Sequence, residues 1–335
     1  MQGWTGREGP AGVAPAAICI GPWPVTIEHK GPGSGRLGEK ACRYAEAVDP
    51  ISFVERPRLD RPSLLCAFRG WNDGGEAASI AARYLAEQWQ ARVVAHLDPE
   101  EFYDFQVTRP RVRLEDGVSR VIDWPRGEFA VASMKGRDVV VFTAVEPNVR
   151  WRTFSQAIIG AARDLGCRLL VTLGAFLTDV PHSRPVPVVG SAADEETATR
   201  LGLARSQYEG PTGIVGVLHD ASNRAGIPSV SLWAAVPHYL PSAPNPKAAL
   251  ALVERASSLL EIPVETRSLL KAVEAWEEGV LRLVQESDEL GEYVSRLETA
   301  VDQRIDEEVP SGEALAAELE RYLRDHGGEP GHGMS

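Results

Sequence analysis

The sequence predicts an α/β protein: a three-layer α/β/α sandwich with a mixed sheet, followed by an acidic helical extension. Two patterns predict this fold class. Between residues 51 and 245, short apolar runs rich in β-branched residues alternate with helical patterns, which is typical of a sheet covered by helices on both faces. From residue 246 to 326, apolar residues recur at steps of three and four, which predicts helices without strands.

The α/β region contains runs that predict buried strands, at residues 64–68, 92–97, 138–143, 168–173 and 229–234. Helical spacing lies between them, at residues 76–88, 153–165, 192–201 and 213–223. Residues 103–132 predict further strands joined by turns. This run of strands indicates that the sheet is mixed rather than purely parallel.

The C-terminal extension carries most of the negative charge. The chain has a net charge of −12, and residues 246–335 contain nine Lys and Arg against 20 Asp and Glu. Apolar stripes at residues 269–283, 290–301 and 315–322 predict amphipathic helices. Each of these helices must bury its stripe against the body, another helix or another chain. The Gly-rich end, residues 327–335, is expected to be disordered.

The N-terminal residues 1–50 differ from the rest of the chain. They are rich in Gly and Pro and have no sustained period of 2 or 3.6, so we expect this extension to be disordered. The chain has 30 Arg and five Lys, which is typical of a GC-rich genome. In such genomes open reading frames extend easily upstream, so a mis-assigned start, with the true one near Val48 or Val54, is an alternative for this segment.

Composition and charge exclude several function classes. The apolar runs are far shorter than the roughly 20 residues that a membrane-spanning helix needs. The acidic balance argues against nucleic-acid binding, which normally requires a basic surface. Four scattered cysteines do not form a disulfide framework or a CxxC metal site. The N-terminus makes a poor secretory signal, so we expect a cytoplasmic protein.

Polar residues follow several of the predicted strands. Asn72 and Asp73 lie in a Gly-rich turn between a strand and a helix, Glu146 and Trp151 follow the next buried strand, and Asp179 follows another. In an open α/β sheet the carboxyl ends of the strands form the ligand crevice, so these loops could line one pocket. The alternative is that they are turn residues and helix caps, and the turn at residues 70–75 matches no phosphate-binding motif.

Two further segments belong to the same candidate crevice. Thr212 and Gly213 precede a predicted helix whose backbone amides could hold a carbonyl or a phosphate, although a simple cap by Thr212 is the better interpretation. His238 follows the last strand. Neither His238 nor His182 has a partner at metal-ligand spacing, and no GxSxG motif supports a hydrolase. The candidate ligand-binding residues are Asn72, Asp73, Glu146, Trp151, Asp179, Thr212, Gly213 and His238.

A group of arginines alternates along one predicted strand. Arg109, Arg111 and Arg113 are separated by single residues and would share one face of that strand. The face is either a docking surface for an acidic partner or a solvated edge on which charge blocks edge-to-edge pairing.

An ordered set of motifs resembles the PAC2 family, the proteasome assembly chaperone 2-like proteins, in its actinobacterial branch. The motifs are LCAFRGWNDGG at residues 65–75, EPNVRW at 146–151, GPTGI at 210–214, SLWAAVPHY at 231–239 and NPK at 245–247. The resemblance spans residues 51–305. It implies an α/β/α fold similar to purine nucleoside phosphorylases. It also implies non-enzymatic chaperones that bind proteasome α subunits, the role of eukaryotic and archaeal members.

This chain departs from the family pattern at its C-terminus. Archaeal-type chaperones dock through a C-terminal hydrophobic-Tyr-X motif, whereas this chain ends in HGMS at residues 332–335. The ATP-grasp label given to some relatives is also disfavoured, because none of the five lysines lies beside the turn at residues 70–75.

From these patterns we expect a non-enzymatic homo-oligomer that binds protein partners, with proteasome subunits as candidates. No catalytic residue, cofactor, metal, nucleic acid or membrane is expected. Two alternatives remain. One is a small-molecule binder or enzyme that uses a nucleoside-phosphorylase-like crevice. It would need an arginine clamp from Arg69, Arg150 or Arg184. The other is an adaptor that recruits a partner through its acidic helices.

Overall fold

The computed structural model describes residues 17–20, 23–26, 49–134, 136–241, 244–307 and 321. The chain divides into two units, residues 1–48 and 49–335. In the first, β1 (Ala17–Ile20) pairs antiparallel with β2 (Trp23–Thr26). The expected disorder of residues 1–50 and 327–335 and the expected third C-terminal helix otherwise fall outside the described residues, so these remain predictions.

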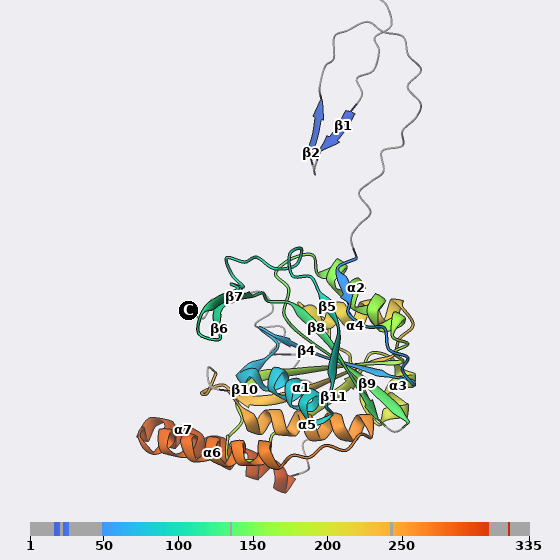
Figure 1. Ribbon diagram of the computed structural model, residues 1–335. Helices are drawn as coiled ribbons and strands as arrows, with labels where there is room; N and C mark the ends of the chain where they lie inside the picture. The colour runs from blue at the N-terminus through green and yellow to red at the C-terminus, as the bar shows by residue number, and fades with distance from the viewer. Residues whose placement is uncertain are drawn as a thin grey trace, which may run out of the picture. The chain divides into compact units, whose positions relative to one another are not determined.

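The second unit is built on a nine-stranded mixed sheet in the order β12-β11-β13-β10-β4-β9-β8-β5-β3 (Figure 1). The four central strands β9, β4, β10 and β13 are parallel, and β8, β5 and β3 continue the sheet with antiparallel pairings. The predicted mixed sheet is therefore confirmed. The strands are β3 (Ile51–Phe53), β4 (Ser63–Arg69), β5 (Arg92–Leu97), β8 (Gly127–Met134), β9 (Arg137–Val145), β10 (Leu169–Thr178), β11 (Val188–Ala192), β12 (Ala204–Arg205) and β13 (Ser229–Pro237).

Helices cover both faces of this sheet. Helices α1 (Ala77–Gln88) and α5 (Pro246–Leu260) lie side by side on one face, and α2 (Trp151–Asp164) and α4 (Ile214–Arg224) lie side by side on the other. Strand β4 supplies both layers through its alternation, because Leu65 packs toward α1 whereas Phe68 joins an aromatic cluster on the α2 side. The predicted three-layer fold is confirmed.

The C-terminal helices extend the α1 and α5 side of the molecule. Helix α5 lies against β13 and α1, so a helix of the expected extension helps to complete the sandwich. Helix α6 (Arg267–Gln285) packs on α5 through Leu269 and Val273, and α7 (Asp288–Glu307) contacts α6. No helix of the described residues is long and apolar enough to span a membrane.

A β-hairpin forms a separate small sheet. Strand β6 (Arg111–Glu115) pairs with β7 (Ser119–Asp123), and Figure 1 shows the two set apart from the central sheet. Arg111 and Arg113 alternate along β6 and are exposed, as the sequence predicts. The intervening face is apolar and also exposed: Val112, Leu114 and Ile122 leave 62%, 60% and 48% of their surface in solvent. We call this hairpin the β6–β7 arm.

Two strand predictions need correction. The segment after residue 173, expected to be a loop, continues β10 to Thr178, because the ring of Trp233 packs where Gly174 has no Cβ: an added Cβ would lie 2.5 Å from the ring. Strand β11 was not predicted, and helix α3 (Glu195–Leu201) begins three residues later than expected. Cys66 and Cys167 are buried as free thiols in the core, and burial raises the pKa of both.

Candidate functional site

Three of the loops singled out in the sequence meet at one carboxylate. Glu146 follows β9, and its Oε1 accepts a hydrogen bond from the backbone N–H of Ile214 at 3.1 Å. Its Oε2 accepts one from the N–H of Trp71 at 3.3 Å. Glycines allow this approach, since a Cβ on Gly70 would lie 2.9 Å from Glu146 Cβ and one on Gly213 would lie 3.3 Å from Oε1. We call this arrangement the Glu146 junction.

The junction is electrostatically balanced by the start of α4. Burial raises the pKa of Glu146, while the two backbone N–H groups act in the opposite direction. The helix begins with Gly213, not Thr212, as its N-cap, and the Glu146 carboxylate takes the place of a capping side chain. Both oxygens of Glu146 are thus engaged in holding backbone.

Asp73 acts on α1 in a similar manner. Its Oδ1 accepts from the N–H groups of Ala78 at 2.8 Å and Ser79 at 3.2 Å, and its Oδ2 accepts from the Ser79 hydroxyl at 2.5 Å. Burial raises the pKa of Asp73 to about 6, against the effect of these bonds. This geometry matches the alternative interpretation from sequence, a tight turn followed by an acidic helix start.

Asn72 differs from these two carboxylates because only one end of its side-chain amide has a hydrogen-bond partner. The side chain is 1% exposed, and its Nδ2 donates to the Phe68 carbonyl at 3.1 Å. Its Oδ1 is buried and has no hydrogen-bond partner among the described residues. A buried acceptor without a partner costs about 1–3 kcal/mol. Asn72 therefore marks a place where a further donor would be stabilising.

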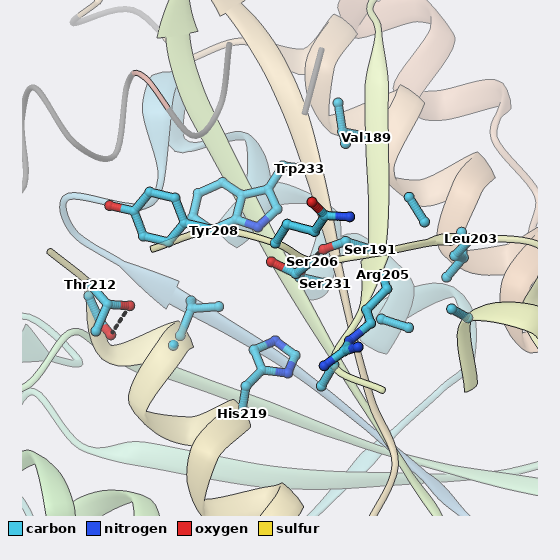
Figure 2. Close-up of a pocket in the computed structure, with 18 of the residues that line it drawn as sticks. Val189, Ser191, Leu203, Arg205, Ser206, Tyr208, Thr212, His219, Ser231 and Trp233 are labelled. Atoms are coloured by element: carbon cyan, nitrogen blue, oxygen red, sulfur yellow. Dashed lines mark hydrogen bonds between the residues drawn. The ribbon is translucent and has the colours of Figure 1, made fainter. Parts of the chain in front are cut away.

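Asn72 lies in the wall of a pocket of about 910 Å³ on the α4 side of the sheet. Strands β11 and β13 form its floor, where Ser191 pairs with Ser231 and Val189 with Trp233 in the antiparallel register. The segment at residues 203–213 borders it. Figure 2 shows the labelled side chains around this space, among them Val189, Ser191, Leu203, Arg205, Ser206, Tyr208, Thr212, His219, Ser231 and Trp233.

His219 contributes a second polar atom without a partner. It projects from α4, and its Nε2 lies 2.9 Å from the Thr172 hydroxyl. Its Nδ1 is buried and has no partner among the described residues. Burial lowers the pKa of His219 to about 4, so the ring is neutral at pH 7. On the floor, the hydroxyls of Ser191 and Ser231 lie 2.9 Å apart.

The eight residues selected from sequence fall into four groups. Asn72, Thr212 and Gly213 line the pocket. Glu146 and Asp73 hold backbone as described above. Trp151 stands at the start of α2, where its Nε1 donates to the Pro147 carbonyl at 2.7 Å.

Asp179 and His238 lie instead beneath α7. His238 Nδ1 is 3.0 Å from Asp179 Oδ1, and the Tyr293 hydroxyl of α7 donates to the same oxygen at 3.1 Å. Arg184 forms a two-pronged pair with Asp302 of α7 at 2.8 and 2.6 Å. We call these contacts the α7 seam. Asp179 and His238 are not among the residues that line the pocket, so the eight residues do not line one pocket.

Several pocket residues were not selected from the sequence. They are Ser191, Arg205, Tyr208, His219, Ser231 and Trp233. One signal existed: Ser191 and Ser231, half-buried and buried, lie within strands of mostly apolar residues. The single histidine in α4 carried no signal by itself.

The described residues contain no arginine clamp of the kind that a phosphorylase would need. Arg150 pairs with Glu101, and Arg184 pairs with residues of α7. Neither these arginines nor Arg69 forms an ion pair with Asp73 or Asp179 in the described part of the chain. The same residues contain no cluster of three or more His, Cys, Asp or Glu that could hold a metal ion.

Comparison with known proteins decides the family. The model of the PAC2 family matches residues 67–284. The chain belongs to the PAC2 family. The resemblance read from the ordered motifs is thus confirmed. A search of curated proteins found no match.

Solved structures of actinobacterial PAC2 proteins are similar to this chain. A PAC2 family protein from Streptomyces avermitilis is 47% identical, with a TM-score of 0.65, and the alignment covers 70% of this chain and 99% of that one. A proteasome-assembly chaperone homologue from Mycobacterium tuberculosis is 45% identical, with a TM-score of 0.63 and coverage of 69% and 99%. An archaeal proteasome activator from Pyrococcus furiosus, 18% identical with a TM-score of 0.58, covers 70% of this chain and 98% of its own and shares the fold.

Proposed function

We propose that this PAC2 protein is a non-enzymatic homo-oligomer that binds proteasome subunits and assists their assembly. The observation that carries the proposal is the 45% identity to the mycobacterial proteasome-assembly chaperone homologue. The match covers 99% of the mycobacterial chain and 69% of this one. Identity at this level across a whole chain supports a shared kind of partner as well as a shared fold.

The chemistry of the loops selected in the sequence supports a role without catalysis. The two carboxylates that sequence analysis selected, the half-buried Glu146 and the buried Asp73, accept hydrogen bonds from the backbone of neighbouring loops and helices. A general acid or base must instead be within reach of a substrate proton. Asp179 and His238 are paired with each other and with Tyr293.

The β6–β7 arm supports self-association. A two-stranded hairpin with Val112, Leu114 and Ile122 exposed gains stability when its apolar face is covered. A second copy of this chain is the occupant we assign to it. Residues 109–126 carry five Arg against three Asp and Glu, so the arm favours an acidic surface.

The matching surface lies at the junction of α6 and α7. Leu283 is 46% exposed there, Glu286 lies three residues later on the same side, and Asp288 and Glu289 follow. This surface therefore offers an apolar side chain to the apolar face of the arm and carboxylates to its arginines. A contact between two different surfaces of identical chains is heterologous, and it closes into a ring when the rotation between copies allows.

Proteasome binding is tested with the purified full chain and the α and β subunits of its host's proteasome. We expect a complex with unassembled α subunits on native mass spectrometry and a faster appearance of assembled particles on native gels. An equal concentration of an unrelated acidic protein is the control. No complex with α subunits, together with an unchanged assembly rate, would overturn the proteasome role.

Self-association is tested separately by light scattering. Arg120 lies opposite Leu114 on the apolar face of the arm. Arg120→Glu is expected to reduce the oligomer to smaller species, and a second chain with Glu286→Arg and Asp288→Arg is expected to restore association with it. Arg152→Glu, an exposed change on α2, is the control. An oligomer unaffected by the arm changes, or a monomeric parent protein, would contradict the assigned contact.

A further inference from the structure

The bend between α6 and α7 contains no residue that requires a bend. Residues 282–290 include neither Gly nor Pro, the residue types that most often end or break a helix. Glu286 has helical dihedral angles, φ −78° and ψ −12°, and its N–H donates to the Arg282 carbonyl at 3.1 Å. Helical geometry therefore extends to Glu286 and resumes at Asp288, with Ser287 between them.

Straightening this bend adds backbone hydrogen bonds. The last carbonyls and the first N–H groups of a helix have no partner within that helix. Ser287 replaces part of the loss, because its Oγ accepts from the Leu290 N–H at 3.3 Å and its N–H donates to the Val284 carbonyl at 3.4 Å. In one continuous helix the N–H groups of Asp288 and Glu289 bond to the carbonyls four residues earlier. Residues 267–307 can therefore form a single helix roughly 60 Å long.

Helix α7 is held on its own chain by contacts that are easily exchanged. Val294, 4% exposed, is the only buried side chain that the structure describes in α7. The α7 seam otherwise holds the helix through polar pairs, in which Arg184 and Asp302 leave 32% and 52% of their side chains exposed. Exposed ion pairs contribute about 0–1 kcal/mol each. Helix α7 can therefore leave the seam without opening the sheet.

A second copy of the chain offers α7 the same docking surface. The polar groups of the seam that contact α7 belong to the loop after β10: Asp179, Ser183 and Arg184. The contact of α7 with α6 is available on the second copy in the same way. Two identical chains that exchange one helix regain the contacts that each loses, and only the bend differs. A second copy is therefore the occupant that fits the seam without any change of sequence.

We infer that α6 and α7 straighten at Ser287 and that two copies exchange α7, so that each α7 docks on the seam of the other chain. This reciprocal dimer goes beyond the assembly role. It has two-fold symmetry, whereas the contact assigned to the β6–β7 arm is heterologous. All chains in the test carry Arg120→Glu, which removes the arm contact, and no proteasome subunit is present, so each proposal can fail without the other.

Two seam variants test the exchange by complementation in the full chain. Arg184→Glu faces Asp302 of its own chain, and Asp302→Arg faces Arg184, so each variant repels its own α7. When the two variants are mixed, exchange gives opposite charges in both seams. Native mass spectrometry of one isotope-labelled variant with the other unlabelled measures the heterodimer. We expect at least about fivefold more heterodimer than in the control mixture.

The control mixture contains the same charges in a different arrangement. It combines the chain with Arg120→Glu alone and a chain that also carries both Arg184→Glu and Asp302→Arg. Exchange between these two chains pairs like charges in both seams. A heterodimer of the single variants that is no more abundant than in this control, or single variants that stay monomeric when mixed, would overturn the inference.

A second measurement leaves the seam charges at Arg184 and Asp302 unchanged. Ser183 and Glu298 contact each other across the seam, so Ser183→Cys in one chain and Glu298→Cys in another bring two thiols together only after exchange. A short bismaleimide is expected to join these two chains. Ala300→Cys, exposed and two residues from Glu298, lies on another side of α7 and should reduce the linking at least about threefold. Linking that occurs only within a single chain carrying both Ser183→Cys and Glu298→Cys would contradict the exchange.

Discussion

The Glu146 junction and the α7 seam both connect loops that follow strands, but they use different kinds of contact. Each ties together loops at the carboxyl ends of strands. The junction uses one half-buried carboxylate on two backbone N–H groups. The seam uses several exposed pairs, such as Arg184 with Asp302 and His238 with Asp179. Exposed ion pairs contribute about 0–1 kcal/mol each, whereas a buried group left without its partner costs about 1–3 kcal/mol. We therefore expect the junction to control global stability and the seam to control only α7.

The largest effect is expected from Glu146→Ala. The change leaves the partly buried N–H groups of Trp71 and Ile214 without the Glu146 acceptor, so the free energy of unfolding should fall by about 4 kcal/mol. Urea denaturation of the full chain measures this loss. Glu87→Ala, an exposed change on α1, is the control and should shift it by less than about 0.5 kcal/mol. Equal losses in both variants would show that the junction contributes no more to global stability than an exposed position does.

The next effect is a pH dependence of stability. Asp73 is buried, and its burial raises the pKa of its carboxyl. Its pKa is about 6 in the folded protein and about 3.9 when unfolded, so its contribution to stability is complete below pH 4. As the pH rises through 6, about 3 kcal/mol is lost. Asp73→Asn cannot ionise. The stability of this variant relative to the parent should therefore rise by about 3 kcal/mol between pH 4 and pH 7.

Urea denaturation at both pH values gives this difference directly. Asp98→Asn, at an exposed position, is the matched control and should show no such trend. A flat difference between Asp73→Asn and the parent would mean that the hydrogen bonds from Ser79 and Ala78 outweigh the burial of Asp73.

A smaller effect is expected at the seam. Tyr293→Phe removes the hydroxyl that donates to Asp179, and global stability should change by at most about 1 kcal/mol. Amide hydrogen exchange in α7 should become faster while exchange in the central strands stays the same. Glu292→Gln, on an exposed position of α7, serves as the control. Faster exchange throughout the sheet would show that the seam is coupled to the core.

The smallest effect on stability is expected in the β6–β7 arm. Leu114→Ser lies on an exposed face, so the free energy of unfolding of the dissociated chain should stay within about 0.5 kcal/mol of the parent. Urea denaturation at low protein concentration checks this value. A larger loss would indicate that the arm packs on its own chain.

The sheet was predictable where burial on both faces produces continuous apolar strands, as in β4 and β9. The failures occurred at glycines. Gly174 indicated a loop, yet β10 passes through it because the Trp233 ring requires the missing Cβ. Gly190 in β11 allows close packing in the same way, with a Cβ position 2.8 Å from Leu203. Local sequence cannot distinguish a glycine that breaks a strand from one that lets a distant side chain approach.

The sequence indicated which loops lie at the carboxyl ends of the strands, but not which groups their side chains contact. Residues following strands were selected correctly as lying at one edge, yet Glu146 binds the N–H of a residue 68 positions later in the chain. Asp179 and His238 were grouped with it because nothing local reports that α7 docks over them. His219 was missed because its role depends on β11 and β13, which place Ser191 and Ser231 in the same pocket.

The two buried thiols can report how often the core of this protein opens. Cys66 lies in the central strand β4 and Cys167 just before β10, both shielded by the core, and burial keeps them in the unreactive thiol form. An alkylating reagent can reach Cys66 only after the core around β4 opens. The rate at which Cys66 is labelled, read by peptide mass spectrometry, therefore reports openings that reach the central sheet under native conditions, and the rate at Cys167, which is 7% exposed, adds openings local to the start of β10.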